Sequence, residues 1–127
     1  MMKHRRPGED FRVSSVDWQL DSVARHVQGG FDPVPRSEVL RRFFVFIEFL
    51  QHHNMTTRTI ASSIEDVTDT IEFRNSDLTD AGFEFVAKYH GKWLNRLWKS
   101  RGTEDDRAVL NKWLKAHHEP REPKPKK

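Results

Sequence analysis

The sequence contains no cysteine, which excludes disulfides, thiolate zinc sites and thiol nucleophiles. It also lacks any run of about 18 apolar residues, so no membrane-spanning helix is expected. The basic start, MMKHRRPGEDFR, is followed by no apolar stretch and does not predict a secretory signal. The glycines form no phosphate-binding pattern. These absences make a cytoplasmic location the default expectation.

Aromatic residues and charged residues are what the sequence has in quantity. Its 127 residues include nine Phe and four Trp, and 32% of them are charged. This combination predicts a single soluble domain with an aromatic core. The basic residues 1–14 and the proline- and lysine-rich residues 119–127 are predicted to be disordered. The globular domain is therefore expected over residues 15–118.

Hydrophobic periodicity predicts two helices in the first half of the chain. The first covers residues 15–28 and ends at a Gly-Gly pair, and the second covers residues 37–54 with Ser37 as its N-cap. The second has a wide apolar face, but Val45 and Phe49 point to its other side. This helix is therefore either central and packed on two sides, or it presents an apolar pair that leaves a dimer possible.

Two more helices are predicted in the second half. The third begins at Ser76 or Thr79 and ends near residue 101, where a glycine follows. The fourth begins with the capping box TEDD at Thr103 and ends near residue 117.

Between the second and third helices, period 3.6 fades and β-branched residues appear. Residues 67–73 alternate in the manner of a strand, and residues 57–64 could pair with them through a turn. The predicted fold class is therefore α+β, mainly α, with about four helices and a small antiparallel β-hairpin between helices two and three.

The sequence predicts no catalytic residue, no metal site and no cofactor. Its histidine pairs, at 52–53 and 117–118, are adjacent, and neighbours on a helix diverge by about 100°. A helical metal pair needs a spacing of three or four residues instead. The acids of the second half are not fixed to any pocket, and the Ser62-Ser63 pair lacks a nucleophile elbow. The chain is therefore predicted not to be an enzyme.

Charge is unevenly distributed along the chain. Residues 63–80 hold six acids against one base, a local net charge of −5, so the rest carries +8. Such an acidic segment could engage a basic cleft in a protein partner. Its candidate binding residues are Glu65, Asp66, Asp69, Glu72 and Asp77.

The third helix carries the opposite charge along one side. Lys88, Lys92, Arg96 and Lys99 fall within about 80° on a helical projection, and Phe85 lies in the same sector. This basic ridge could be a solvated face, could follow nucleic-acid phosphates, or could belong to a protein interface with Phe85 as its anchor. The adjoining acids would repel phosphate and therefore favour a protein partner.

Parts of the sequence resemble a known type of protein. The arrangement FIEFLQHHNM…TIEFRNSDLTDAGFEFVAKYHGKWLNRL…TEDDRAVLNKWLK, over about residues 40–116, is similar to small bacterial immunity proteins, the partners of polymorphic and contact-dependent toxins. The resemblance implies a protein that neutralises a toxin, such as a nuclease, by occluding its active site. It transfers no site residue.

A second likeness supports the alternative that the basic ridge binds nucleic acid. The stretch LTDAG, residues 78–82, is similar to the strand-to-helix junction of winged-helix regulators. It implies a nucleic-acid-binding regulator that uses the basic ridge of the third helix.

Overall fold

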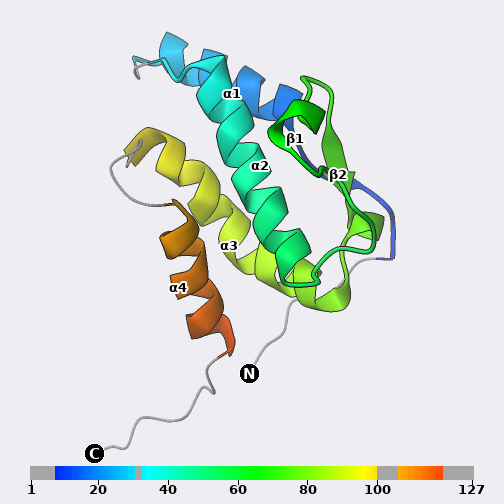
Figure 1. The fold of residues 1–127 in the computed structure, drawn as a ribbon. Helices are drawn as coiled ribbons and strands as arrows, with labels where there is room; N and C mark the ends of the chain where they lie inside the picture. Colours follow the sequence, from blue (N-terminus) through cyan, green and yellow to red (C-terminus); the bar gives the residue numbers. More distant parts are fainter. Residues whose placement is uncertain (1–7, 31–32, 100–105, 119–127) are drawn as a thin grey trace, which may run out of the picture.

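The computed structural model describes residues 8–30, 33–99 and 106–118, with residues 96–99, 106 and 118 described by backbone alone. The α+β, mainly α fold class is confirmed, with four helices and a two-stranded antiparallel sheet (Figure 1). The elements in chain order are β1 (Arg12–Ser15), α1 (Val16–Gln28), α2 (Arg36–His52), the 3-10 turn η1 (Ile64–Asp66), β2 (Glu72–Arg74), the 3-10 turn η2 (Asn75–Asp77), α3 (Asp80–Lys99) and α4 (Asp106–His118).

Helix α2 is the central element, as the first of the two interpretations expected. It contacts each of the other three helices, α1, α3 and α4 (Figure 1). Val45 and Phe49, on its less apolar side, are only 3% and 6% exposed. The ring centroids of Phe46 and Phe49 lie 6.5 and 5.5 Å from that of Phe85 on α3. Both sides of α2 are therefore covered by apolar neighbours.

The ends of α1 and α2 show which local signals act. The hydroxyl of Ser15 accepts a hydrogen bond from the Trp18 N–H, so Ser15 caps α1. The Gly-Gly pair ends this helix as predicted, with Gly30 in the left-handed region at φ 102°. Helix α2 is capped by Pro35, two residues before the predicted Ser37, because the Pro35 carbonyl accepts the first backbone hydrogen bonds.

The predicted hairpin has the wrong partner strand. β2 pairs with β1, which precedes the first helix, with Ser14 opposite Phe73 and Ser15 opposite Glu72. Residues 12–14 were expected in a disordered arm but form most of β1, and Ser14 is 3% exposed. Alternation identifies a strand but not its partner, which here comes from some 60 residues earlier in the chain.

The stretch SDLTDAG, residues 76–82, has a structural explanation. The Thr79 hydroxyl accepts a hydrogen bond from the Gly82 N–H, and the Thr79 N–H donates to the Met55 carbonyl at 3.0 Å. Thr79 thus caps α3, one of the two predicted caps. A Cβ at Gly82 would lie 2.0 Å from the Met55 carbonyl oxygen. Glycine is needed because the backbones of α3 and the preceding loop touch there.

Candidate functional site

The predicted acidic surface is largely neutralised from within, beginning with Asp77. Asp77 is 6% exposed, so its assignment as a partner-binding residue is wrong. Its carboxylate accepts a hydrogen bond from the Arg74 N–H at 2.8 Å and is contacted by the Arg58 Nε at 2.7 Å. It holds together the turn before α3 instead of facing a partner.

Two further acids of this set have arginine partners. Asp69 is paired with Arg36 at the start of α2. Glu72 lies 2.7 Å from Arg12 on β1 and 3.3 Å from Arg74 on its own strand. A count of charges along residues 63–80 does not reveal these partners, because two of the three arginines, Arg12 and Arg36, come from distant parts of the sequence.

Arg74 is shared with the N-terminal segment. Its guanidinium contacts Asp10 at 3.2 Å, and Asp10 also accepts a hydrogen bond from the Ser76 N–H at 2.8 Å. This hydrogen bond, with help from Arg74, lowers the pKa of Asp10. Conversely, Asp10 and then Glu72 raise the pKa of Arg74. These contacts fasten the start of the chain to the acidic segment.

One part of the acidic segment stays open to solvent, and we call it the acidic turn: Ile64, Glu65 and Asp66. Ile64 is 42% exposed although it is large and apolar. Glu65 is exposed and makes no hydrogen bond or ion pair with the described residues. Asp66 accepts hydrogen bonds from the backbone N–H groups of Ser62 and Ser63, at 2.8 and 3.3 Å. The turn is thereby capped and its shape is fixed.

The acidic turn is also anchored to α2. The Gln51 side chain donates to the Ala61 carbonyl at 2.8 Å. The Oε1 atom of the same Gln51 side chain accepts hydrogen bonds from the N–H groups of Ile60 and Ala61, at 2.6 and 3.1 Å. Three hydrogen bonds from one amide therefore hold the chain just before the turn against the central helix.

The basic ridge is divided by burial, and Phe85 is not part of its surface. Phe85 is 0% exposed, so the prediction of an exposed anchor is wrong. Its ring meets Phe49 of α2 at 5.5 Å and His117 of α4 at 5.8 Å. A helical projection assigns one buried side, whereas α3 is covered by α2 and α4 from two directions. The residues that remain exposed in this sector are thus fewer than predicted.

The lysines at the middle of α3 are exposed as predicted. The Nζ atoms of Lys88 and Lys92 lie 5.4 and 5.5 Å from the centroid of the Tyr89 ring. Tyr89 itself is buried and stacks on Trp113 of α4. The side chains of Arg96 and Lys99 lie outside the described part of the structure. Two of the predicted cations are therefore seen to share one surface.

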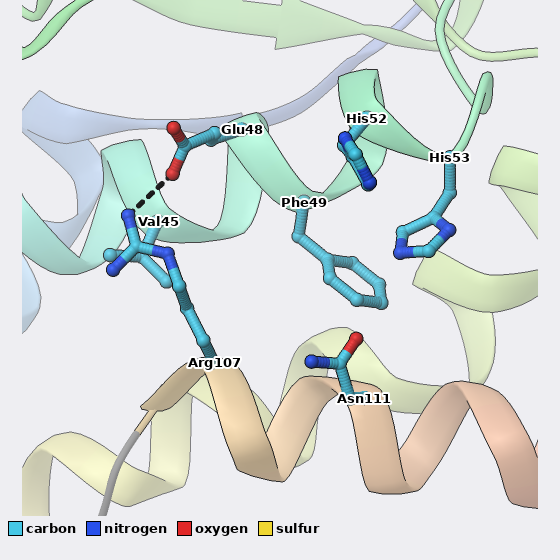
Figure 2. Close-up of a pocket in the computed structure, with 7 residues that line it drawn as sticks. All are labelled: Val45, Glu48, Phe49, His52, His53, Arg107 and Asn111. Atoms are coloured by element: carbon cyan, nitrogen blue, oxygen red, sulfur yellow. Dashed lines mark hydrogen bonds and ion pairs between the residues drawn. The ribbon is translucent and has the colours of Figure 1, made fainter.

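A groove of about 340 Å³ lies between α2 and α4, and sequence reasoning did not predict it. Figure 2 shows Phe49 pointing from α2 toward Asn111, and Arg107 of α4 bridging to Glu48 of α2 at 2.5 Å. His52 and His53 close one end, with ring centroids 4.9 Å apart. The apolar residues Val45 and Phe49 on the polar side of α2 were the sequence signal that could have indicated this groove. The helix that forms its other side, α4, lies some 60 residues further along the chain.

A metal site and a membrane-spanning helix are both absent from the described residues. Within residues 8–30, 33–99 and 106–118, no three His, Asp or Glu side chains are grouped so that they could hold a metal ion. In the same ranges, no helix has the length and apolar character needed to cross a membrane.

Comparisons with protein-family models, with curated proteins and with solved structures found no match for this chain. The resemblance to immunity-type proteins therefore stays a prediction.

Proposed function

We propose that this chain is a non-catalytic binding protein of the immunity type, which neutralises a bacterial toxin acting in the cytoplasm by occluding its active site. The observation that carries the proposal is the acidic turn. It presents an exposed isoleucine beside two exposed carboxylates on a backbone that is held in place.

The shape of the acidic turn suits docking because little order has to be gained on binding. The Asp66 cap and the Gln51 anchor already fix the backbone, so the entropy lost on association is small. An apolar side chain at the centre of a contact supplies burial, and charges around it set orientation. Ile64 and Glu65 have these two roles in the proposal.

The expected partner has a positively charged active-site cleft, as nucleases do. Carboxylates can occupy the subsites of a phosphate backbone and accelerate association through long-range attraction. Asp69 and Glu72 are paired with arginine in the free protein, so Glu65 and Asp66 provide most of this attraction. The docking surface is consequently smaller than the full set of predicted acids.

The test uses the toxin domain encoded by an adjacent gene, with association followed by stopped-flow at low salt. Glu65→Lys is expected to slow association several-fold, and added salt should reduce the difference between the variants. Ile64→Ala is expected to speed dissociation, because it removes buried apolar contact and not charge. Asp21→Lys is the matched control, since Asp21 is exposed on α1 and makes no hydrogen bond or ion pair with the described residues.

Equal slowing by Glu65→Lys and Asp21→Lys would show that only net charge matters and would refute the acidic turn as the docking surface. Tight, steeply salt-dependent binding of random duplex DNA, lost in Lys92→Glu, would support the nucleic-acid alternative instead. That outcome would place the function on the exposed Lys88 and Lys92.

A further inference from the structure

A second hollow, of about 210 Å³, lies between β1, α1 and α3 on residues that the proposed docking does not use. We call it the α1–α3 pocket. Its lining combines an indole, an imidazole, an amide and two hydroxyls with aliphatic side chains. The residues are Val13, Ser14, Trp18, Gln19, Ser22, His90 and Leu94.

His90 is a polar group of this pocket that packs against aromatic rings of the core. Its ring lies against Phe46 and Phe73, with centroids 5.3 and 6.2 Å away. It makes no hydrogen bond or ion pair with the described residues. Neither ring nitrogen is a fully enclosed atom, so each keeps some accessible surface. The partnerless imidazole therefore reaches the open space of the pocket.

The imidazole is uncharged at neutral pH. Burial lowers the pKa of His90 to about 4, and no charged group contributes to this shift. A neutral imidazole offers one N–H donor and one acceptor nitrogen. A ligand that contacts both would need a complementary acceptor and donor.

The amide of Gln19 adds a further free acceptor. Gln19 is 7% exposed, and its Nε2 donates to the Ser14 hydroxyl at 3.2 Å. No described residue donates to Oε1, which is also not fully enclosed. This oxygen, the His90 nitrogens and the Trp18 indole N–H are side-chain polar atoms of the pocket that have no partner among the described residues.

Trp18 forms an accessible aromatic wall. It is 47% exposed, and the Arg12 guanidinium lies 4.9 Å from the centroid of its ring. Aromatic rings of ligands stack favourably on such indoles. None of the lining residues carries a full charge at neutral pH, and the nearby Arg12 is already paired with Glu72 at 2.7 Å. A charged ligand would therefore gain little in exchange for the water it would lose.

We propose that the α1–α3 pocket binds a small, uncharged nitrogen heterocycle that carries a hydrogen-bond donor and an acceptor, the class to which nucleobases and nicotinamide belong. A volume of 210 Å³ is below the roughly 300–1,000 Å³ of pockets for drug-sized ligands, which limits the ligand to about one ring system. His90 and Gln19 read its polar edge, and Trp18 contacts its face.

The test is an NMR titration of the isotope-labelled full chain at neutral pH with adenine, uracil, nicotinamide and nicotinate. Nicotinamide and nicotinate share the same ring, but the first carries a neutral amide where the second carries a carboxylate. At least one neutral probe is expected to shift the Trp18 indole N–H and the Gln19 side-chain amide in a saturable manner. Nicotinate is expected to produce no saturable shift, because its charge would be buried without a partner.

Variants separate this site from nonspecific binding. His90→Phe removes the two nitrogens and is expected to weaken binding about tenfold or more. Trp18→Ala alters an exposed side chain and tests the same site should His90→Phe not fold. Val27→Ala, exposed on the same helix but outside the pocket, should bind as the unmodified chain does. The proposal is overturned by no saturable shift with any neutral probe, by nicotinate binding as well as nicotinamide, or by unchanged affinity in the folded pocket variants.

Discussion

The helical core and the connecting segment, residues 53–79, are held together by different forces. In the core, aromatic rings of three helices pack on one another, as in the stacked pairs Phe46–Trp93 and Tyr89–Trp113. In the connecting segment, single polar side chains fix the backbone, as Asp77 does for the Arg74 N–H. The core depends on burial, whereas the segment adds individual hydrogen bonds to the burial of a few side chains such as Phe73 and Leu78.

This difference explains why the acids were misread as a free surface. A segment with little regular structure must satisfy its backbone groups through side chains, and short acidic residues do this well. Asp66 and Asp77 cap turns, and Asp69 and Glu72 pair with arginines. A local excess of carboxylates is therefore compatible with stabilising contacts inside one domain as well as with a docking surface.

The largest expected effect is at the junction of the two regions. Gly82→Ala would place a Cβ 2.0 Å from the Met55 carbonyl, and backbone cannot yield as a flexible side chain can. We expect a loss of about 3 kcal/mol in the free energy of unfolding, the upper part of the range for overpacking. Urea denaturation of the variant measures it.

Gly91→Ala is the control on the same helix. A Cβ at Gly91 meets no atom within 4 Å, so alanine should stabilise α3 by about 0.5–1 kcal/mol through its better helix propensity. Two Gly→Ala changes on one helix should thus have opposite signs. Similar effects from both would show that the close contact with Met55 does not constrain the fold.

The next effect compares two acids of the connecting segment. Asp77→Ala leaves the Arg74 N–H without its acceptor and removes the Arg58 contact, and we expect a loss of about 2–3 kcal/mol. Asp69→Ala breaks a pair whose side chains are both more than half exposed, and the loss should stay below about 1 kcal/mol. Chemical denaturation of both variants distinguishes them. Equal losses would contradict the assignment of Asp77 as a structural residue.

A smaller effect probes the core through pH. Burial lowers the pKa of His90 from 6.5 to about 4, so the unfolded chain takes up this proton first as the pH falls. Stability from this group is present above the unfolded pKa and is lost as the pH falls through the window from 6.5 to about 4. Between pH 7 and pH 5 the loss should be about 2 kcal/mol.

His90→Phe supplies the comparison, because it should lack this loss between the two pH values. Glu38 does not interfere, since Arg41 and then Arg42 lower its pKa to about 2 and keep it ionised in that range. If the unmodified protein and His90→Phe lose the same stability, the imidazole is not buried in its neutral form.

Much of the fold could be predicted from the sequence, but much less of the candidate site. The first helix and its glycine stop, the second helix as a central element, and Thr79 as a cap were all expected from local pattern. Phe85 was misplaced because two helices from different parts of the chain cover it. The α2–α4 groove and the α1–α3 pocket also combine distant elements, and a local pattern carries no record of them.

By itself, the sequence determined that α1 ends at its Gly-Gly pair and that Thr79 caps α3, because capping residues and glycines act over a few residues. Only the tertiary structure decided which strand pairs with β2, which acids have arginine partners and which aromatic rings are hidden. These outcomes depend on contacts between residues far apart in the chain, and each contact changes how much water and charge a side chain meets. Because of such contacts, Asp77 is buried and stabilises the fold, whereas Glu65 is exposed, although both lie in the same acidic stretch.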